Sequence, residues 1–264
     1  MKYKKILLTG GSGKLGHAIV SSNFFPQILA PSHNILDLTK SITVEKFFEK
    51  NDFDSLIHCA ALARMTECET DPIKAVQTNI LGTINLVVET IKKETKKKKK
   101  IRFVHISTDG VYPGTKGNYS EVDEAIPYNK YGWTKLGAEC AVRLLSDFCI
   151  IRTSFFDPEK IAFKESAVDA YSSKIPIDYL VKAIAKILES NFTGVINLGS
   201  ERKSDYERYK EFKPSLKPCN LKDILKKVPF AMARDASMDT SLWRKIEKMP
   251  PMCKRIRNVT KLTY

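Results

Sequence analysis

The chain opens with the stretch Ile6-Leu7-Leu8-Thr9-Gly10-Gly11-Ser12-Gly13-Lys14-Leu15-Gly16. Apolar residues predict a short buried strand over residues 3–8, and the apolar spacing of residues 14–22 predicts a helix directly after the glycines. Glycine permits a tight turn, lets the backbone approach a pyrophosphate, and allows the helix to pack closely on the sheet. Free N–H groups at the helix N-terminus attract the same anion. Gly10, Gly13 and Gly16 in this context therefore predict a dinucleotide site.

Strand and helix patterns alternate from this stretch to about residue 198. We predict further strands over residues 27–30, 55–59, 102–106, 148–152 and 194–198, and helices over residues 43–51, 72–95, 129–145 and 176–190. Such alternation is typical of βαβ units. The predicted fold class is therefore α/β, a Rossmann-type doubly wound parallel sheet. Gly10, Thr108 and Arg152 all lie at the carboxyl ends of predicted strands, the edge where such sheets bind ligands.

From about residue 200 the alternation gives way to a lysine-rich stretch with several prolines. We predict two parts: an NAD(P)-binding Rossmann domain over residues 1–199 and a small substrate-binding lobe over residues 200–264. The first part would include a short substrate-lobe insertion near residues 155–175.

The formal charge of +14 raises the question of a nucleic-acid partner. Five of the lysines form the run Lys96 to Lys100 between two predicted elements, and such runs are usually solvated loops. Neither a basic patch interleaved with aromatic residues nor a nucleic-acid motif accompanies the charge. We expect no nucleic acid, and note that a basic surface suits a doubly phosphorylated nucleotide.

Cysteine spacing and hydropathy give two further expectations. The cysteines form no CxxC pair and no Cys/His cluster with zinc spacing, so we expect reduced thiols and no metal; they are Cys59, Cys68, Cys140, Cys149, Cys219 and Cys253. The apolar run behind the N-terminal lysines is only Ile6-Leu7-Leu8, too short for a signal peptide. No run reaches the length of a membrane span. We expect a cytoplasmic protein.

Tyr131 and Lys135 lie four residues apart in a predicted helix and therefore share a face. A neighbouring ammonium favours phenolate, so we expect Lys135 to lower the pKa of Tyr131 from about 10 toward neutral pH, where a general acid/base works best. Without other signals, a tyrosine and a lysine at this spacing are more often an ordinary pair on the protein surface. The glycine turn upstream favours the catalytic interpretation.

The second predicted strand ends in Ala30-Pro31-Ser32-His33-Asn34, which contains no acid. A carboxylate here would bind the adenosine ribose and repel a 2′-phosphate. Its absence, with Ser32 and His33 nearby, favours NADP(H); NAD(H) is the alternative.

These motifs together resemble the extended short-chain dehydrogenase/reductase superfamily, and within it the dTDP-4-dehydrorhamnose reductase family. The resemblance covers roughly residues 4–198 and returns near residues 233–246. It rests on the glycine loop and on Leu36-Asp37-Leu38-Thr39, Cys59-Ala60-Ala61, Glu67 to Pro72 with Asn79, Ser107-Thr108-Asp109, Tyr131 to Lys135, and Arg152-Thr153-Ser154. It implies a set of cofactor-binding residues, namely Gly10, Gly13, Lys14, Leu15, Gly16, Asp37, Leu38, Ala60, Ala61, Asn79, Tyr131 and Lys135.

The same resemblance implies catalytic and substrate roles. Thr108 would hydrogen-bond the substrate carbonyl, with Ser107 as its competitor, and Tyr131 would protonate the carbonyl oxygen. Lys135 would hold the nicotinamide ribose, and Asn79 would help to keep the site in shape. Asp109 and Thr108 would contact the substrate, and Arg234 would meet its diphosphate. Hydride would come from the cofactor.

The implied activity is the NADPH-dependent reduction of a 4-keto-6-deoxy sugar on a nucleoside diphosphate such as dTDP or UDP. Gly110 stands where related dehydratases carry a second acid, which disfavours dehydration. A nucleotide-sugar 4-epimerase with tightly bound NAD stays open. So does a non-enzymatic NADP-binding regulator similar to a subunit of methionine adenosyltransferase, although such regulators commonly lose the tyrosine and lysine. A homodimer is expected by analogy. The region between Ser154 and Pro176 is short for the family, which leaves the sugar undetermined.

Overall fold

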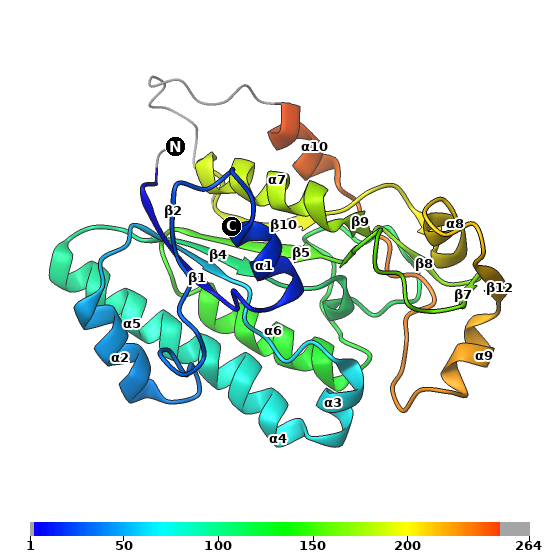
Figure 1. Ribbon diagram of the computed structural model, residues 1–264, viewed down its shortest axis with the longest axis horizontal. Helices are drawn as coiled ribbons and strands as arrows, with labels where there is room; N and C mark the ends of the chain where they lie inside the picture. Colours follow the sequence, from blue (N-terminus) through cyan, green and yellow to red (C-terminus); the bar gives the residue numbers. More distant parts are fainter. Residues whose placement is uncertain (1–2, 249–264) are drawn as a thin grey trace.

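A six-stranded parallel sheet forms the centre of the molecule in the computed structural model, which describes residues 3–248 (Figure 1). The strand order is β10-β5-β4-β3-β1-β2, and each neighbouring pair is parallel. The strands are β1 (Lys5–Thr9), β2 (Gln27–Leu29), β3 (Ser55–His58), β4 (Arg102–Ile106), β5 (Phe148–Thr153) and β10 (Gly194–Leu198). The predicted Rossmann-type α/β fold is confirmed. The order reverses between β1 and β3, which is where such sheets bind ligands.

Helices cover both faces of this sheet, because strands that are apolar throughout must be buried on both sides. Successive residues of β1 point to opposite faces: Ile6 and Leu8 belong to one core cluster and Leu7 to the other. The first cluster lies under α1 (Lys14–Val20), α7 (Ile177–Glu189) and α10 (Ser241–Lys248), and the second under α2 (Ser41–Lys50), α5 (Gly82–Lys97) and α6 (Lys130–Val142) (Figure 1).

The helix predicted over residues 72–95 is divided in the structure. After α3 (Met65–Thr70), the Asp71 side chain accepts a hydrogen bond from the Lys74 N–H and caps the short helix α4 (Pro72–Ala75). A π-helix, η1 (Val76–Leu81), then leads into α5. Such wide turns are often found at functional sites, and this one carries Asn79.

A small lobe lies beside the carboxyl ends of the strands (Figure 1). It is built from two separate stretches, residues 157–174 and residues 199–235, which pair with each other: β7 with β12 and β8 with β11. Its elements, with the short flanking pair β6 and β9, are β6 (Phe155–Phe156), β7 (Glu165–Ala167), β8 (Tyr171–Ser172), β9 (Ile175–Pro176), β11 (Lys203–Ser204), α8 (Asp205–Lys210), β12 (Lys217–Cys219) and α9 (Leu221–Leu225).

The chain then returns from the lobe to the sheet. Trp243 and Ile246 of α10 are buried in the same core cluster as Ile6 and Leu8. The division into two parts at residue 199 stays a prediction, and its last segment, residues 249–264, lies outside the described residues together with Cys253. The five cysteines within residues 3–248 are free thiols. None of the helices in that range is long and apolar enough to cross a membrane.

Candidate active site

The glycine turn after β1 lies against the end of β3. Gly10 has φ +75°, and a Cβ added there would lie 2.6 Å from the Ala60 nitrogen. A Cβ at Gly16 would lie 2.1 Å from the Gly10 carbonyl oxygen. Gly13 begins α1 without a side-chain cap, and the first turn of that helix contains no acid. A side-chain-free turn that leads into uncapped N–H groups fits the pyrophosphate of a dinucleotide.

The other predicted cofactor residues differ in exposure. Lys14 is exposed at the start of α1, whereas the Leu15 side chain is buried in the core. Ala60 and Ala61 are half-buried after β3. Asp37 accepts hydrogen bonds from the Thr39 N–H (3.0 Å) and hydroxyl (2.7 Å), which shape the turn ahead of α2, and Leu38 is buried. The His33 ring is exposed and lies 3.9 Å from the Asp37 carboxylate.

Thr108 and Tyr131 come together because the start of α6 packs on the turn after β4. The Asn129 side chain caps α6 by accepting from the Gly132 N–H (2.9 Å). A Cβ at Gly132 would lie 2.2 Å from the Gly110 carbonyl oxygen, so only glycine permits this approach. The Thr108 hydroxyl accepts from the Gly110 N–H (3.1 Å) and donates to Asp109 (3.2 Å). The same hydroxyl lies close enough to the Tyr131 phenol to favour its ionised form.

The expected influence of Lys135 on Tyr131 is wrong. Burial raises the pKa of Tyr131 well above its usual value, the nearby Asp109 charge raises it further, and the Thr108 hydroxyl acts in the opposite direction. Lys135 is not among the groups that shift it. The reason is the direction of the Lys135 side chain, whose Nζ lies 3.2 Å from Nε2 of His105. Sharing a helix face was not sufficient to bring the ammonium to the phenol.

Lys135 is nevertheless held within the site region. Its side chain is 2% exposed. Burial lowers the pKa of Lys135 to about 8, whereas the neighbouring Glu139 and Cys59 act to raise it. Cys59 directly follows β3, so the ammonium lies near the strand end that also contacts the glycine turn.

Asn79 fastens α6 to the loop after β3. Its amide donates to Thr134 Oγ1 (2.8 Å) and to the Leu62 carbonyl (3.1 Å), and its oxygen accepts from the Leu62 N–H (2.7 Å). Thr134 in turn donates to the Tyr131 carbonyl (2.8 Å). Asn79 therefore joins three segments, and the shaping role that the resemblance implied for it stays a prediction.

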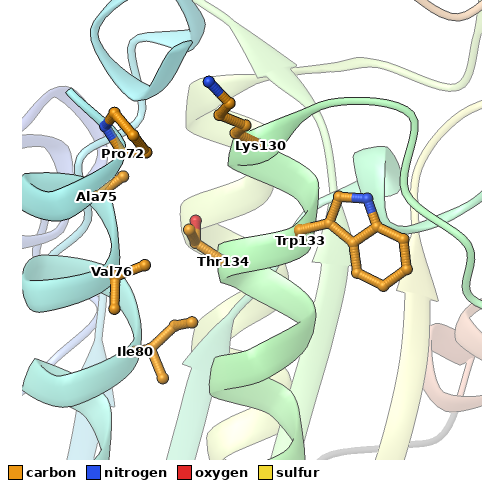
Figure 2. A pocket seen from close by; sticks show the side chains of 7 residues that line it. All are labelled: Pro72, Ala75, Val76, Ile80, Lys130, Trp133 and Thr134. Atoms are coloured by element: carbon orange, nitrogen blue, oxygen red, sulfur yellow. The ribbon is translucent and has the colours of Figure 1, made fainter. Parts of the chain in front are cut away.

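An apolar groove of about 180 Å³ lies between α6 and the segment formed by α4 and η1 (Figure 2). Thr134 points from α6 toward the η1 side, whereas Trp133 points away from it and is half-exposed. Neither Thr108, Tyr131 nor Lys135 lines this groove.

A buried ion pair lies beneath the site. Arg152 of β5 donates to Glu139 of α6, with Nη2 2.8 Å from Oε2 and Nε 3.1 Å from Oε1. The Ser107 hydroxyl donates to the same carboxylate at 2.5 Å. Ser107 is therefore committed to Glu139, and the choice of Thr108 over Ser107 for the substrate carbonyl stays a prediction.

The lobe contributes charged residues that sequence reasoning missed. Lys174 donates to both carboxylate oxygens of Asp205, at 2.9 and 2.8 Å. Burial raises the pKa of Asp109 to about 6, and the charge of Lys174 lowers it. Neither Lys174 nor Asp205 lies in a motif, and only the pairing of β8 with β11 brings them together, so the sequence offered no signal for them.

Arg234, the residue predicted to meet the substrate diphosphate, lies beside the lobe. Its side chain is exposed, and its carbonyl accepts from the Tyr171 N–H (2.8 Å) beside the lobe. The neighbouring Asp235 is bound by Arg202 (2.7 Å). The role of Arg234 at the substrate diphosphate stays a prediction.

Comparison with known proteins shows the family to which this chain is related. The model described as the RmlD substrate binding domain matches residues 4–168. A probable low-salt glycan biosynthesis reductase, Agl14 of Haloferax volcanii, is 36% identical over 144 residues, which cover 53% of this chain and 46% of that protein. The chain spans about half the length of the curated relatives it matches.

Solved structures agree over nearly the whole chain. A hypothetical dTDP-4-dehydrorhamnose reductase from Sulfolobus tokodaii has a TM-score of 0.78 and 29% identity, covering 94% of this chain and 96% of that one. The dTDP-4-dehydrorhamnose reductase of Bacillus anthracis, in complex with NADP, has a TM-score of 0.82 and 20% identity, covering 94% of both chains. The second likeness concerns the fold alone.

Proposed function

Because this chain belongs to the RmlD substrate-binding domain family, we propose that it is a reductase that uses NADPH to reduce the keto group of a nucleotide-linked 4-keto-6-deoxy sugar. Membership confirms the resemblance read from the motifs. The observation that carries the proposal is the meeting of Thr108 and Tyr131 at the strand edge that also holds the glycine turn. The activities for which the similar reductases are named support the substrate class.

Tyr131 is suited to act as a general acid. Because burial raises the pKa of Tyr131, its phenol is protonated at neutral pH and can give its proton to a carbonyl oxygen that gains negative charge. The Thr108 hydroxyl would orient that oxygen. When bound, NADPH supplies the hydride, which no side chain can provide.

Lys135 contributes a buried positive charge. Its ammonium would hold the nicotinamide ribose. Asp109 and Arg234 are the residues we assign to the sugar and the diphosphate.

The surroundings of β2 support NADPH over NADH. The strand end carries no carboxylate, and a hollow of about 750 Å³ beside it is lined by Ser32, Lys46 and Lys50 among others. Cations and a hydroxyl suit a 2′-phosphate, which an acid would repel. A similar fold in complex with NADP supports the same choice.

The test is the loss of NADPH absorbance with UDP-, dTDP- and GDP-linked 4-keto-6-deoxyhexoses. We expect turnover with one of them, and loss of most activity in Tyr131→Phe but not in Tyr206→Phe, a tyrosine of the lobe. NAD that copurifies, without net consumption of NADPH, would instead indicate the epimerase. Binding of NADPH without turnover on any of these sugars would indicate the regulator. The cytoplasmic location, the homodimer and the absence of a nucleic-acid partner stay predictions.

A further inference from the structure

Two buried histidines lie side by side below the active site. His58 ends β3 and is paired in register with His105 on β4. Their exposures are 1% and 0%, and their ring centroids are 5.1 Å apart. Two polar rings inside a sheet core require hydrogen-bond partners, and those partners differ for the two residues.

His58 is fully used in holding the fold. The Thr83 hydroxyl donates to the Asn79 carbonyl (2.7 Å), so its oxygen accepts from Nε2 of His58 (2.9 Å). Nδ1 of His58 therefore accepts from the Thr9 hydroxyl (2.7 Å). This chain of hydrogen bonds connects the residue before the glycine turn to α5 and η1.

His105 has one partner, the Lys135 ammonium, 3.2 Å from its Nε2. An ammonium can only donate, so Nε2 accepts and the ring proton must be on Nδ1. Nδ1 is buried and has no hydrogen-bond partner among residues 3–248. An unpaired buried donor is unfavourable, so the ring orientation is explained by its contact with Lys135 and not by a demand of the core.

The charges around the two histidines favour an uncharged His105 ring, which can accept a hydrogen bond. Burial and the charge of Lys135 hold the pKa of His105 well below its usual value, and they lower the pKa of His58 to about 3. The titratable groups that face the ammonium are Cys59 after β3, His105 on β4 and Glu139 on α6, which is itself paired with Arg152 on β5. A protonated imidazole at His105 would repel the ammonium.

We infer that His105 is a positioning residue for the reaction: its neutral ring accepts a hydrogen bond from Lys135, fixes the place of the ammonium and keeps it protonated. This inference rests on the proposed function, in which Lys135 serves the cofactor. His105 itself touches neither the substrate nor the reacting atoms.

The first test compares three variants through their pH profiles. His105→Leu removes the acceptor, and His105→Gln places an amide oxygen near the position of Nε2. The alkaline limb of the pH profile is the fall in kcat at high pH, where Lys135 loses its proton. We expect this limb to move down by about one pH unit in His105→Leu, as for the loss of one hydrogen bond to a charged group, and to return to its original position in His105→Gln. His58→Gln is the matched control: it is equally buried and should lose thermal stability without moving the limb. An unchanged limb in a folded His105→Leu protein would overturn the inference.

The second test needs no turnover. Long-range ¹H–¹⁵N NMR of the imidazoles should show a proton on Nδ1 of His105 and on Nε2 of His58, and only the His105 signals should change strongly in Lys135→Met. The pH dependence of NADPH binding should shift in His105→Leu as the kinetic limb does. If no sugar were reduced, these two measurements would still decide the inference, while the proposed function alone would fail. A proton on Nε2 of His105 would contradict the inference whatever the activity.

Discussion

Replacing Glu139 with glutamine removes the charge that stabilises Arg152 inside the protein. The two side chains are 0% and 2% exposed, and three hydrogen bonds join them. Loss of one partner from a buried pair costs about 3–5 kcal/mol, because the other charge is left uncompensated. Glutamine keeps one oxygen for the guanidinium, so we expect a loss near the lower limit, about 3 kcal/mol in the free energy of unfolding.

Urea denaturation followed by circular dichroism measures this loss directly. For a chain of this size, a loss of about 3 kcal/mol corresponds to a fall in Tm of about 6–12 °C. The exposed Glu124→Gln is the control and should change stability by less than about 0.5 kcal/mol. The double variant Glu139→Gln/Arg152→Met leaves no unpaired charge and should be more stable than Glu139→Gln. A loss below about 1 kcal/mol, or a double variant that loses the sum of both single changes, would refute the reasoning.

Three further changes test other parts of the site. Gly16→Ala would place a Cβ 2.1 Å from the carbonyl oxygen of Gly10, so we expect NADPH binding to weaken by about tenfold or more. The control is Gly137→Ala, where a Cβ would meet only a flexible side chain. Equal NADPH affinities of the two variants in a binding titration would contradict the expectation. Asn79→Leu removes three hydrogen bonds, and we expect a loss of about 2 kcal/mol in stability together with a larger fall in kcat than in KM, measured by denaturation and steady-state kinetics. Burial raises the pKa of Asp109 to about 6, from about 4 in an unfolded chain. The folded state therefore binds the extra proton, and stability should fall as pH rises from about 4 to about 6, by up to about 3 kcal/mol. Asp109→Asn should abolish this part of the pH dependence in urea denaturation, and an unchanged profile would show that the carboxyl is not buried as described.

The sheet and the cofactor turn could be predicted because their signals are local. An apolar strand, a glycine spacing and an amphipathic helix follow one another within the first residues, and the same alternation recurs up to β10. The spacing of Tyr131 and Lys135 indicated a shared helix, which α6 confirms. The lobe was harder, because its strands are only two or three residues long and show no readable periodicity.

The wrong prediction had a tertiary cause. Lys135 was expected at the Tyr131 phenol because four residues separate them on the helix. In the folded protein the nearest acceptor for its ammonium comes from β4, about thirty residues earlier in the chain, and the burial of the phenol outweighs any charge on α6. Similarly, η1 interrupts a sequence with ordinary helical character, and nothing in residues 76–81 alone indicates a wider turn.

The return of the chain from the lobe to the sheet also orders events during synthesis. Trp243 packs in the core and donates to the Tyr179 hydroxyl of α7 (2.9 Å), so α10 covers apolar surface of α7 and β10. A ribosome makes α10 only after the whole lobe. The apolar surface of α7 and β10 that α10 covers therefore stays exposed while residues 199–240 are made, and we expect nascent chains that stop before α10 to be the ones that chaperones bind.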